Sequence, residues 1–198
     1  MEALLARHSV AVKRLGAPGP SAAELLSIYE AATTAPDHGA LRPWRLIEIG
    51  NEARPQLAQL FIDGKRRSQS ELSAAEIERE REKAVRPPVL LAFVARPIAN
   101  HPTVPAVEQL ASAGAAMQLV LVAAHFLGYG AIILSGARCA DRNVMASLQI
   151  GEDEIFLGFI SIGSIVDEPR FGKRPEIHQV VSKMERLKIE LREEATVV

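Results

Sequence analysis

The chain has 198 residues, of which 48% are hydrophobic, so it is long enough to bury one core and short for two domains. Its formal net charge of -1 offers no basic field to the backbone of DNA or RNA, which argues against a nucleic-acid partner. The single cysteine, Cys139, excludes an internal disulfide and thiolate zinc sites.

The N-terminal stretch "MEALLARHSV" has an acid at position 2 and no basic segment followed by an apolar one. We therefore expect no secretory signal and a cytoplasmic location. In "ARHSVAVKRLGAPGP", Arg7 offers a planar fork and Ser9 a hydroxyl donor, a combination that suits one phosphate monoester, with Lys13 and Arg14 nearby. The alternative is that Arg7 and His8 only complement the carboxyl end of a first helix.

The next element, "PSAAELLSIYEAATTAP", begins with a capping box of Ser21 and Glu24, which predicts a helix that ends before Pro36. The loop "PDHGALRPW" follows and carries His38 and Arg42, two residues that can hold an anion. It is either a binding loop or a polar turn that leads into a largely covered strand, "WRLIEIG".

Two helices are expected next, the first over residues 52 to 62 and the second over "SAAEIEREREKAVR", with a capping box of Ser73 and Glu76. The second helix is mostly charged, and its opposite charges stand three or four residues apart. This pattern favours a solvated face with a weak apolar stripe, as in a mobile excursion or lid, over a binding patch. The spaced pairs are Glu76 with Arg79, Glu78 with Arg81, and Glu82 with Arg86.

Three further strands are predicted at "PVLLAFVARP", "GAIILSG" and "EIFLGFISIG", with a short helix at "DRNVMASLQI". Between the first two, residues 110 to 134 contain no Asp, Glu, Lys or Arg, and the stretch is long enough for a membrane span. Because Gln118 and His125 lie within it and Gly128 interrupts it, we predict a buried helix instead. Small side chains on nearly every face of residues 110 to 127 further predict a covering subunit in an obligate dimer.

Helices interleaved with four strands predict a single three-layer α/β or α+β domain. The tail from Pro175 is helix-forming and polar enough to lie on the surface or along a partner. The turn "EPRFGKRPEI" before it gathers Arg170, Lys173 and Arg174, which form either a second anion site or a solvated basic turn.

Familiar catalytic patterns are missing from the sequence, which has no GxGxxG after a strand, no Walker A loop, no HExxH and no GxSxG. The five histidines lack metal-ligand spacing, so we expect no metal site. Anion binding is therefore the chemistry that the residues themselves support.

The ordered combination of these segments resembles the nitroreductase family of flavoproteins. It runs from "RHS" through "aPDHgalrPWrl" and "EQLASAGAAMQLVLVAAHFLGYGAIILSG" to "GFISIGSIVDEPRFGKRPEI". The likeness covers about residues 4 to 180 and is greatest to the compact branch with a "PDH…PW" loop. It implies an α+β fold with a central sheet flanked by helices, an intertwined homodimer, and FMN bound between the subunits. Residues 1–180 would form the FMN-binding domain, and 181–198 a C-terminal helical tail.

The resemblance also implies site residues. Arg7, His8 and Ser9 would hold the FMN phosphate and ribityl chain, completed by Lys173 or Arg174. Thr34 and His38 would reach the flavin from the other subunit. The ring would lie along Ile133, Leu134 and Ser135, and the nicotinamide along Ala123, Ala124, His125, Phe126, Leu127 and Gly128.

The family pattern is changed at several of these places. An arginine that usually follows the motif serine by two residues is replaced by Ala11, and the loop has Ala40 and Arg42 where relatives carry asparagine and glutamine. Two function hypotheses follow. The first is an oxidoreductase that uses FMN and NADH or NADPH to reduce nitroaromatics, quinones or similar electrophiles, without a catalytic side chain. The second is a flavin-binding carrier or regulatory dimer with little turnover.

Overall fold

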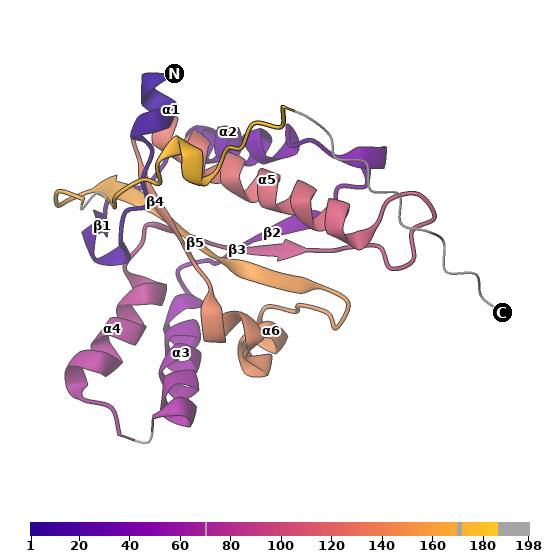
Figure 1. Cartoon of the computed structure of the whole chain (residues 1–198). Coiled ribbons are helices and arrows are strands. Elements are labelled where there is room, and N and C mark those ends of the chain that lie inside the picture. The colour runs from indigo at the N-terminus through magenta and orange to yellow at the C-terminus, as the bar shows by residue number, and fades with distance from the viewer. Residues whose placement is uncertain (70, 170–171, 186–198) are drawn as a thin grey trace.

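The computed structural model describes residues 1–69, 71–169 and 172–185 (Figure 1). Its main elements are α1 (Glu2–Ala6), β1 (Leu15–Gly16), α2 (Ala22–Thr33), β2 (Trp44–Glu48), α3 (Arg54–Ser68), α4 (Ala74–Val85), β3 (Val89–Ala95), α5 (Ala106–Phe126), β4 (Gly130–Leu134), α6 (Arg142–Ser147) and β5 (Ile155–Ile165). The 3-10 helices are η1 (Val12–Arg14), η2 (His38–Ala40), η3 (Gly136–Ala140) and η4 (Ile177–Gln179).

One antiparallel sheet contains all the strands, and β5 is its central member. The strand order is β1-β5-β3-β2, and β4 pairs with β5. Ile162 of β5 has Val89 of β3 as one partner and Ala131 of β4 as the other, so β4 lies on the side of β5 away from β3. The two-residue β1 makes five strands instead of the expected four, because so short a strand leaves no alternating pattern in the sequence.

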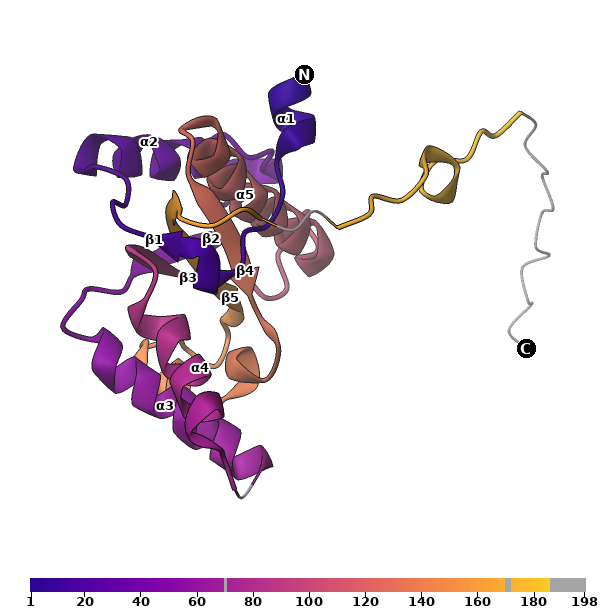
Figure 2. The same ribbon diagram turned by 90° about the vertical axis from the view of Figure 1, so that its left-hand side faces the viewer.

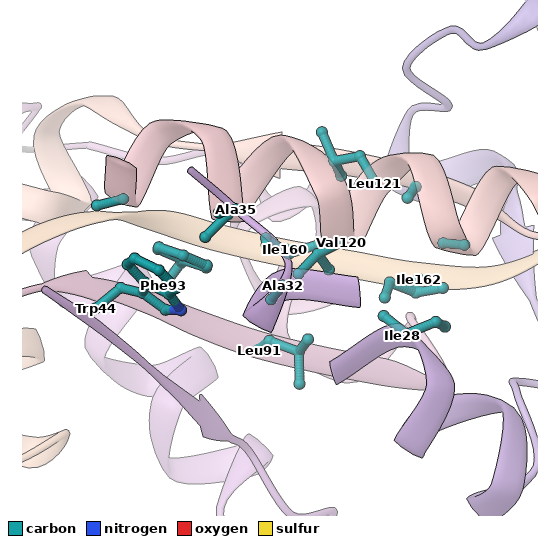
Figure 3. Packing of buried hydrophobic residues seen from close by; sticks show 14 of the residues in the cluster. Ile28, Ala32, Ala35, Trp44, Leu91, Phe93, Val120, Leu121, Ile160 and Ile162 are labelled. Atoms are coloured by element: carbon teal, nitrogen blue, oxygen red, sulfur yellow. The ribbon is translucent and has the colours of Figure 1, made fainter. Parts of the chain in front are cut away.

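Side chains of β3 alternate between two apolar layers. Leu91 and Phe93 pack with α2 and α5 (Figure 3), whereas Leu90 and Val94 pack with α3 and α6, the helices on the other side of the sheet in Figure 1. A strand covered on both faces has no polar side, which explains the unbroken apolar run in the sequence. Helices on both faces of an antiparallel sheet confirm the predicted three-layer α+β fold.

Both predicted capping boxes are present. The Ser21 hydroxyl accepts from the Glu24 amide at 3.3 Å, and the Glu24 carboxylate accepts from the Ser21 amide at 2.8 Å. Ser73 and Glu76 make the same pair of bonds at the start of α4. Each box satisfies two amides that the first helical turn leaves unpaired, and thereby fixes where the helix begins.

The long apolar helix α5 packs against α2, β3 and β4, so it forms part of the core as predicted. Only one side of it is covered. By length and composition it could cross a membrane, and 33% of its most apolar window is buried within the chain. Val107 and Phe126 near its two ends are 71% and 58% exposed.

The charged helix α4 has the expected solvated face at Glu78, Arg79 and Arg81 but departs from the expectation in its pairing and at Glu80. Of its three expected ion pairs, only Glu82 with Arg86 forms among the described residues, at 2.9 Å. The Glu76 carboxylate instead accepts the capping hydrogen bond at the start of α4, and the Glu80 residue is buried, with 8% of its surface exposed. The helical period alone could not show this, because α4 packs along α3 and against η1 and so covers part of its charged surface.

The C-terminal tail is largely extended where it is described. Residues 175–185 contain only the one-turn η4, so the helix expected from Pro175 is absent over this range, and residues 186–198 lie outside the described part. Figure 2 shows the tail leaving the body of the domain. Its apolar side chains Ile177, Val180, Val181 and Met184 are 61% exposed or more.

Candidate functional site

The segment after α1 lies beside β4, although more than a hundred residues separate them in sequence. Ser9 forms an isolated parallel bridge with Ala131, and the Val10 amide donates to the Ala131 carbonyl at 3.0 Å. Of the predicted phosphate residues, Arg7 and His8 are half-buried and Ser9 is exposed. The structure therefore brings the first predicted cluster next to the strand predicted to hold the flavin ring.

Arg174 joins the same place from the far end of the chain. Its Nη2 donates to the carbonyl of Leu5 at 2.7 Å and to that of Arg7 at 2.6 Å. His8 Nδ1 lies 2.9 Å from the Ala6 carbonyl oxygen. The helix-end interpretation thus applies to Arg174 and His8. The guanidinium of Arg7 has no hydrogen bond or ion pair with a described residue and can face a ligand.

Lys173, the other late basic candidate, is exposed and forms no ion pair within the described residues. Arg170 lies outside the described residues, so the basic turn is seen only in part. Arg174 therefore holds the end of α1 in place, while Lys173 is the neighbouring cation that remains available to a ligand.

The outer edge of β4 is open beyond Ala131. The amide and carbonyl of one residue in an antiparallel strand point to the same side, and the side alternates along the strand. Since the Ala131 carbonyl faces outward to Val10, the backbone amide and carbonyl of Ile133 also face outward. Backbone donors are thus available where the side chains of Ile133 and Leu134 offer no polar group.

A cavity of about 590 Å³, here called the β4 cavity, lies on the α4 side of this strand. Its volume falls in the usual range for small-molecule sites. Ile132 and Leu134 line it from the strand, Ala11 and Lys13 from the N-terminal segment, and Lys65 from α3. The side chain of Ile133 packs against the opposite, α5 layer, and Ser135 is exposed just past the strand.

The charges around the β4 cavity leave a positive excess. Lys13, Lys65, Arg79 and Lys83 line it against Glu76, Glu80 and Glu82, which leaves an excess of one positive charge. Glu80 and Glu82 are paired and Glu76 caps α4 near Lys65, whereas Lys13, Lys65 and Arg79 form no ion pair within the described residues. Such a cavity suits a ligand with a negative charge, because unpaired cations attract it without first losing a partner.

Glu80 remains ionised despite its burial. Burial raises the pKa of its carboxyl, but hydrogen bonds and charges from Lys83 and Arg138 outweigh that effect and hold the pKa below its ordinary value. Lys83 lies 2.5 Å from one carboxylate oxygen and Arg138 lies 2.5 Å from the other. A single anion is therefore shared by two cations at the wall of the cavity.

Thr34 and His38 lie far from Arg7 in the same chain. His38 Nδ1 pairs with the Glu108 carboxylate at 2.8 Å near the start of α5, and His125 Nε2 meets the Ala3 carbonyl of α1 at 2.7 Å near its end. The helix between residues 108 and 125 is about 25 Å long at about 1.5 Å per residue. One chain therefore does not bring the two predicted groups together.

The loop of residues 36–44, predicted to be either a binding loop or a polar turn, has a fixed conformation. The Asp37 carboxylate accepts from the Arg42 amide at 2.6 Å, and Ala40 and Arg42 have φ angles of 51° and 50°. Left-handed backbone at residues other than glycine costs free energy and occurs often at functional sites. Arg42 is exposed and forms no ion pair with the described residues.

The predicted nicotinamide segment, residues 123–128, comprises the last turn of α5 and the two residues after it. Ala124 is fully buried in the core, so its side chain does not reach a ligand. Phe126 and Leu127 are 58% and 39% exposed, and Gly128 has a φ of 86°, a left-handed conformation that favours glycine at a helix end. Ala123 and His125 are half-buried.

Sequence reasoning missed Lys65 and Arg138. Lys65 lies on a charged helix end whose pattern is typical of a solvated surface, and Arg138 lies in an unremarkable loop. No local signal distinguishes them, because both acquire their surroundings only when α3 and α4 pack beside β4. Among residues 1–69, 71–169 and 172–185, no group of three or more His, Cys, Asp or Glu side chains could hold a metal ion.

Fold and site together define an α+β domain with a cation-lined cavity beside an open strand edge. The chain belongs to the nitroreductase family, whose model matches residues 4–164. It is 32% identical over 164 residues to the Escherichia coli protein named "Putative NAD(P)H nitroreductase YdjA", covering 83% of this chain and 87% of that protein.

Solved structures show the same fold. A nitroreductase-like family protein from Bacillus cereus has a TM-score of 0.75 at 20% identity, over 93% of this chain and 95% of that one. The NADPH:FMN oxidoreductase from Vibrio harveyi has a TM-score of 0.71 at 17% identity, over 96% of this chain and 79% of that one.

Proposed function

We propose that this chain is an FMN-dependent oxidoreductase that uses NADH or NADPH to reduce nitroaromatics, quinones or similar small electrophiles. The observation that carries the proposal is the meeting of the Arg7–Ser9 segment, Arg174 and the open edge of β4 beside one cation-lined cavity. The names of the similar proteins, an NAD(P)H nitroreductase and an NADPH:FMN oxidoreductase, support the same cofactors.

The described residues fit FMN. Arg7 has an unengaged guanidinium for the phosphate, with Ser9 and Lys173 as further donors. The outward backbone groups of Ile133 would meet the polar edge of the ring, and Ile132 and Leu134 would pack on its face. A strand edge with no protein partner has amides that a flat heterocycle can use.

Lys13 is the best substitute for the positive charge that relatives carry at the position of Ala11. Arg14, the other nearby base, forms an ion pair with Asp167 at 3.0 Å and is only 12% exposed. Lys13 is exposed and lines the β4 cavity beside Ala11. We therefore assign to Lys13 the charge that relatives supply two residues earlier.

When bound, FMN supplies the hydride and electron transfer that protein side chains cannot perform. In the first step with a nitro compound, the nitro group, NAD(P)H and one proton become a nitroso group, NAD(P)⁺ and water. The residues of β4 would hold the ring, and α3 and α4 would exclude water from the cavity. No side chain is assigned as general acid or base, and water supplies the proton.

We further propose that the active form is an intertwined homodimer. His38 and Arg7 lie at opposite ends of α5, so Thr34 and His38 can serve a flavin only if a second subunit provides them. The uncovered side of α5 and the exposed apolar tail residues would then be buried between subunits. The cytoplasmic location remains our prediction.

The decisive experiment mixes the purified protein with FMN and NADH or NADPH without air and follows the flavin absorbance. Rapid loss of the visible absorbance band of oxidised FMN is expected, followed by recovery of the band when a nitroaromatic is added. If the protein binds FMN and the band persists with both nucleotides, the oxidoreductase proposal is wrong and the carrier hypothesis takes its place.

A further inference from the structure

A second cavity of about 340 Å³, here called the side pocket, lies between α3, α4 and the loop after β4. It shares Lys65, Glu80 and Lys83 with the β4 cavity, so the two spaces adjoin. Arg138 of η3 lines the side pocket and not the β4 cavity. A ligand could thus extend from one space into the other.

The side pocket carries more positive than negative charge. Asp141 is already compensated, because its Oδ2 pairs with Arg67 and its Oδ1 accepts the Asn143 amide at 3.0 Å. Glu80 is shared by Lys83 and Arg138, while Lys65 forms no ion pair with a described residue. Because Arg67 neutralises Asp141, the three cations Lys65, Lys83 and Arg138 face only one other carboxylate, that of Glu80.

The apolar side of the pocket is aromatic. Leu60, Phe61 and Val144 line it, and the Arg138 guanidinium carbon lies 5.0 Å from the centre of the Phe61 ring. This cation–π contact with Phe61 holds the guanidinium against the wall. Its Nη2 donates to Glu80 and its Nε is buried without an acceptor among the described residues, so a carboxylate in the pocket would meet the remaining Nη donors of the guanidinium.

We propose that the side pocket selects an electron acceptor that is an aromatic acid. Its carboxylate would lie between Arg138 and Lys65, its ring against Leu60 and Phe61, and its reducible group toward the β4 cavity. This inference rests on the proposed oxidoreductase function and adds the class of substrate. The carboxylate is bound and not changed, so the redox chemistry is that of the nitro group alone.

The kinetic test compares 4-nitrobenzoate with 4-nitrobenzamide, which has the same outline and no charge. The FMN-loaded enzyme should show a kcat/KM at least about tenfold higher for the acid, as expected for charge-assisted hydrogen bonds. Arg138→Gln should abolish most of this preference, read as the ratio of the two kcat/KM values measured in the same variant. Arg66→Gln removes a charge from α3 that lines neither cavity, and should keep the preference.

A binding test does not depend on turnover. In calorimetry with the FMN-loaded protein and no nucleotide, benzoate should bind at least about tenfold more tightly than benzamide. If Arg138→Gln proves unstable, Ser68→Glu serves as the second variant. It is an exposed change at the rim of the side pocket that leaves the ion pairs intact, and it should weaken benzoate binding.

The outcomes separate the two claims. If both nitro compounds are reduced with equal kcat/KM and benzoate binds no better than benzamide, the side-pocket proposal is overturned and the oxidoreductase stands. If benzoate binds only when FMN is removed, the pocket belongs to the flavin and the proposal is likewise overturned. If the protein binds FMN but reduces neither compound, the oxidoreductase proposal itself fails, and the acceptor assignment fails with it.

Discussion

Arg54 fastens the base of the α3–α4 pair that walls the β4 cavity. Its side chain is buried, with 6% exposed, at the first position of α3. The guanidinium donates to the carbonyls of Ile49 at 3.1 Å and Pro88 at 3.0 Å, and also to that of Pro87. One side chain thus joins the chain entering α3 to the chain leaving α4.

Replacing Arg54 by Met keeps most of the volume and removes all three bonds. Each charge-assisted bond contributes about 1.5 to 3 kcal/mol, but the three share one cation whose burial is itself costly. We therefore expect the free energy of unfolding to fall by about 3 to 5 kcal/mol, a large part of the usual total of about 5 to 15. Arg54→Lys retains one donor group and should fall between wild type and Arg54→Met.

Urea unfolding followed by far-UV circular dichroism measures the loss. Arg66→Met, on the exposed side of the same helix, is the matched control and should change stability by less than about 0.5 kcal/mol. If Arg54→Met lies within about 1 kcal/mol of wild type, the three carbonyl contacts do not hold the base of α3 and α4, and this reasoning is refuted.

Three other predictions concern charge, cofactor and assembly. The pKa of Glu80 is lowered in the folded chain, so its pairs with Lys83 and Arg138 stabilise the fold above the usual carboxyl pKa near 4.5 and lose that effect as pH falls through the lower folded value. Between about pH 3 and 6, the urea midpoint should therefore decline less steeply with falling pH in Glu80→Gln than in wild type. Equal slopes would contradict the assignment. Arg7→Ala and Lys13→Ala should each weaken FMN binding by about ten- to a hundredfold while riboflavin binding changes little, measured by fluorescence titration; an equal loss for both flavins would point to a structural role. Light scattering at micromolar concentration should give a dimer, and a folded monomer would exclude the shared flavin site.

Local sequence signals located most elements because those elements depend on local physics. The capping boxes at Ser21 and Ser73 begin helices where predicted, since hydroxyl and carboxylate partners three residues apart satisfy the first amides whatever surrounds them. The unbroken apolar run of β3 indicated a strand covered on both faces. Over residues 175–185 the expected helix is absent except for one turn, because a segment with helical propensity but no packing partner lacks the contacts that would stabilise it, and the rest of the predicted tail lies outside the described residues.

For the candidate site, the sequence and the tertiary structure supply different information. The sequence, through its resemblance to a family, supplied Arg7, Ser9 and Arg174 as candidates, but could not say which base replaces the one missing at Ala11. The packed chain supplies the observation behind our proposal of Lys13, since it pairs Arg14 with Asp167 and leaves Lys13 at the cavity. It is likewise the tertiary structure that turns the backbone of Ile133 toward the open edge of β4.

The sequence by itself determined the order of the elements, the apolar layers and the family. The tertiary structure decided which charges face a cavity and which are already paired, including the sharing of Glu80 by Lys83 and Arg138 across 58 positions of the chain. The physical reason is range. Capping and periodicity act within one or two turns of a helix or strand, whereas the surroundings of a charge depend on segments that meet only when the sheet and its helices pack together.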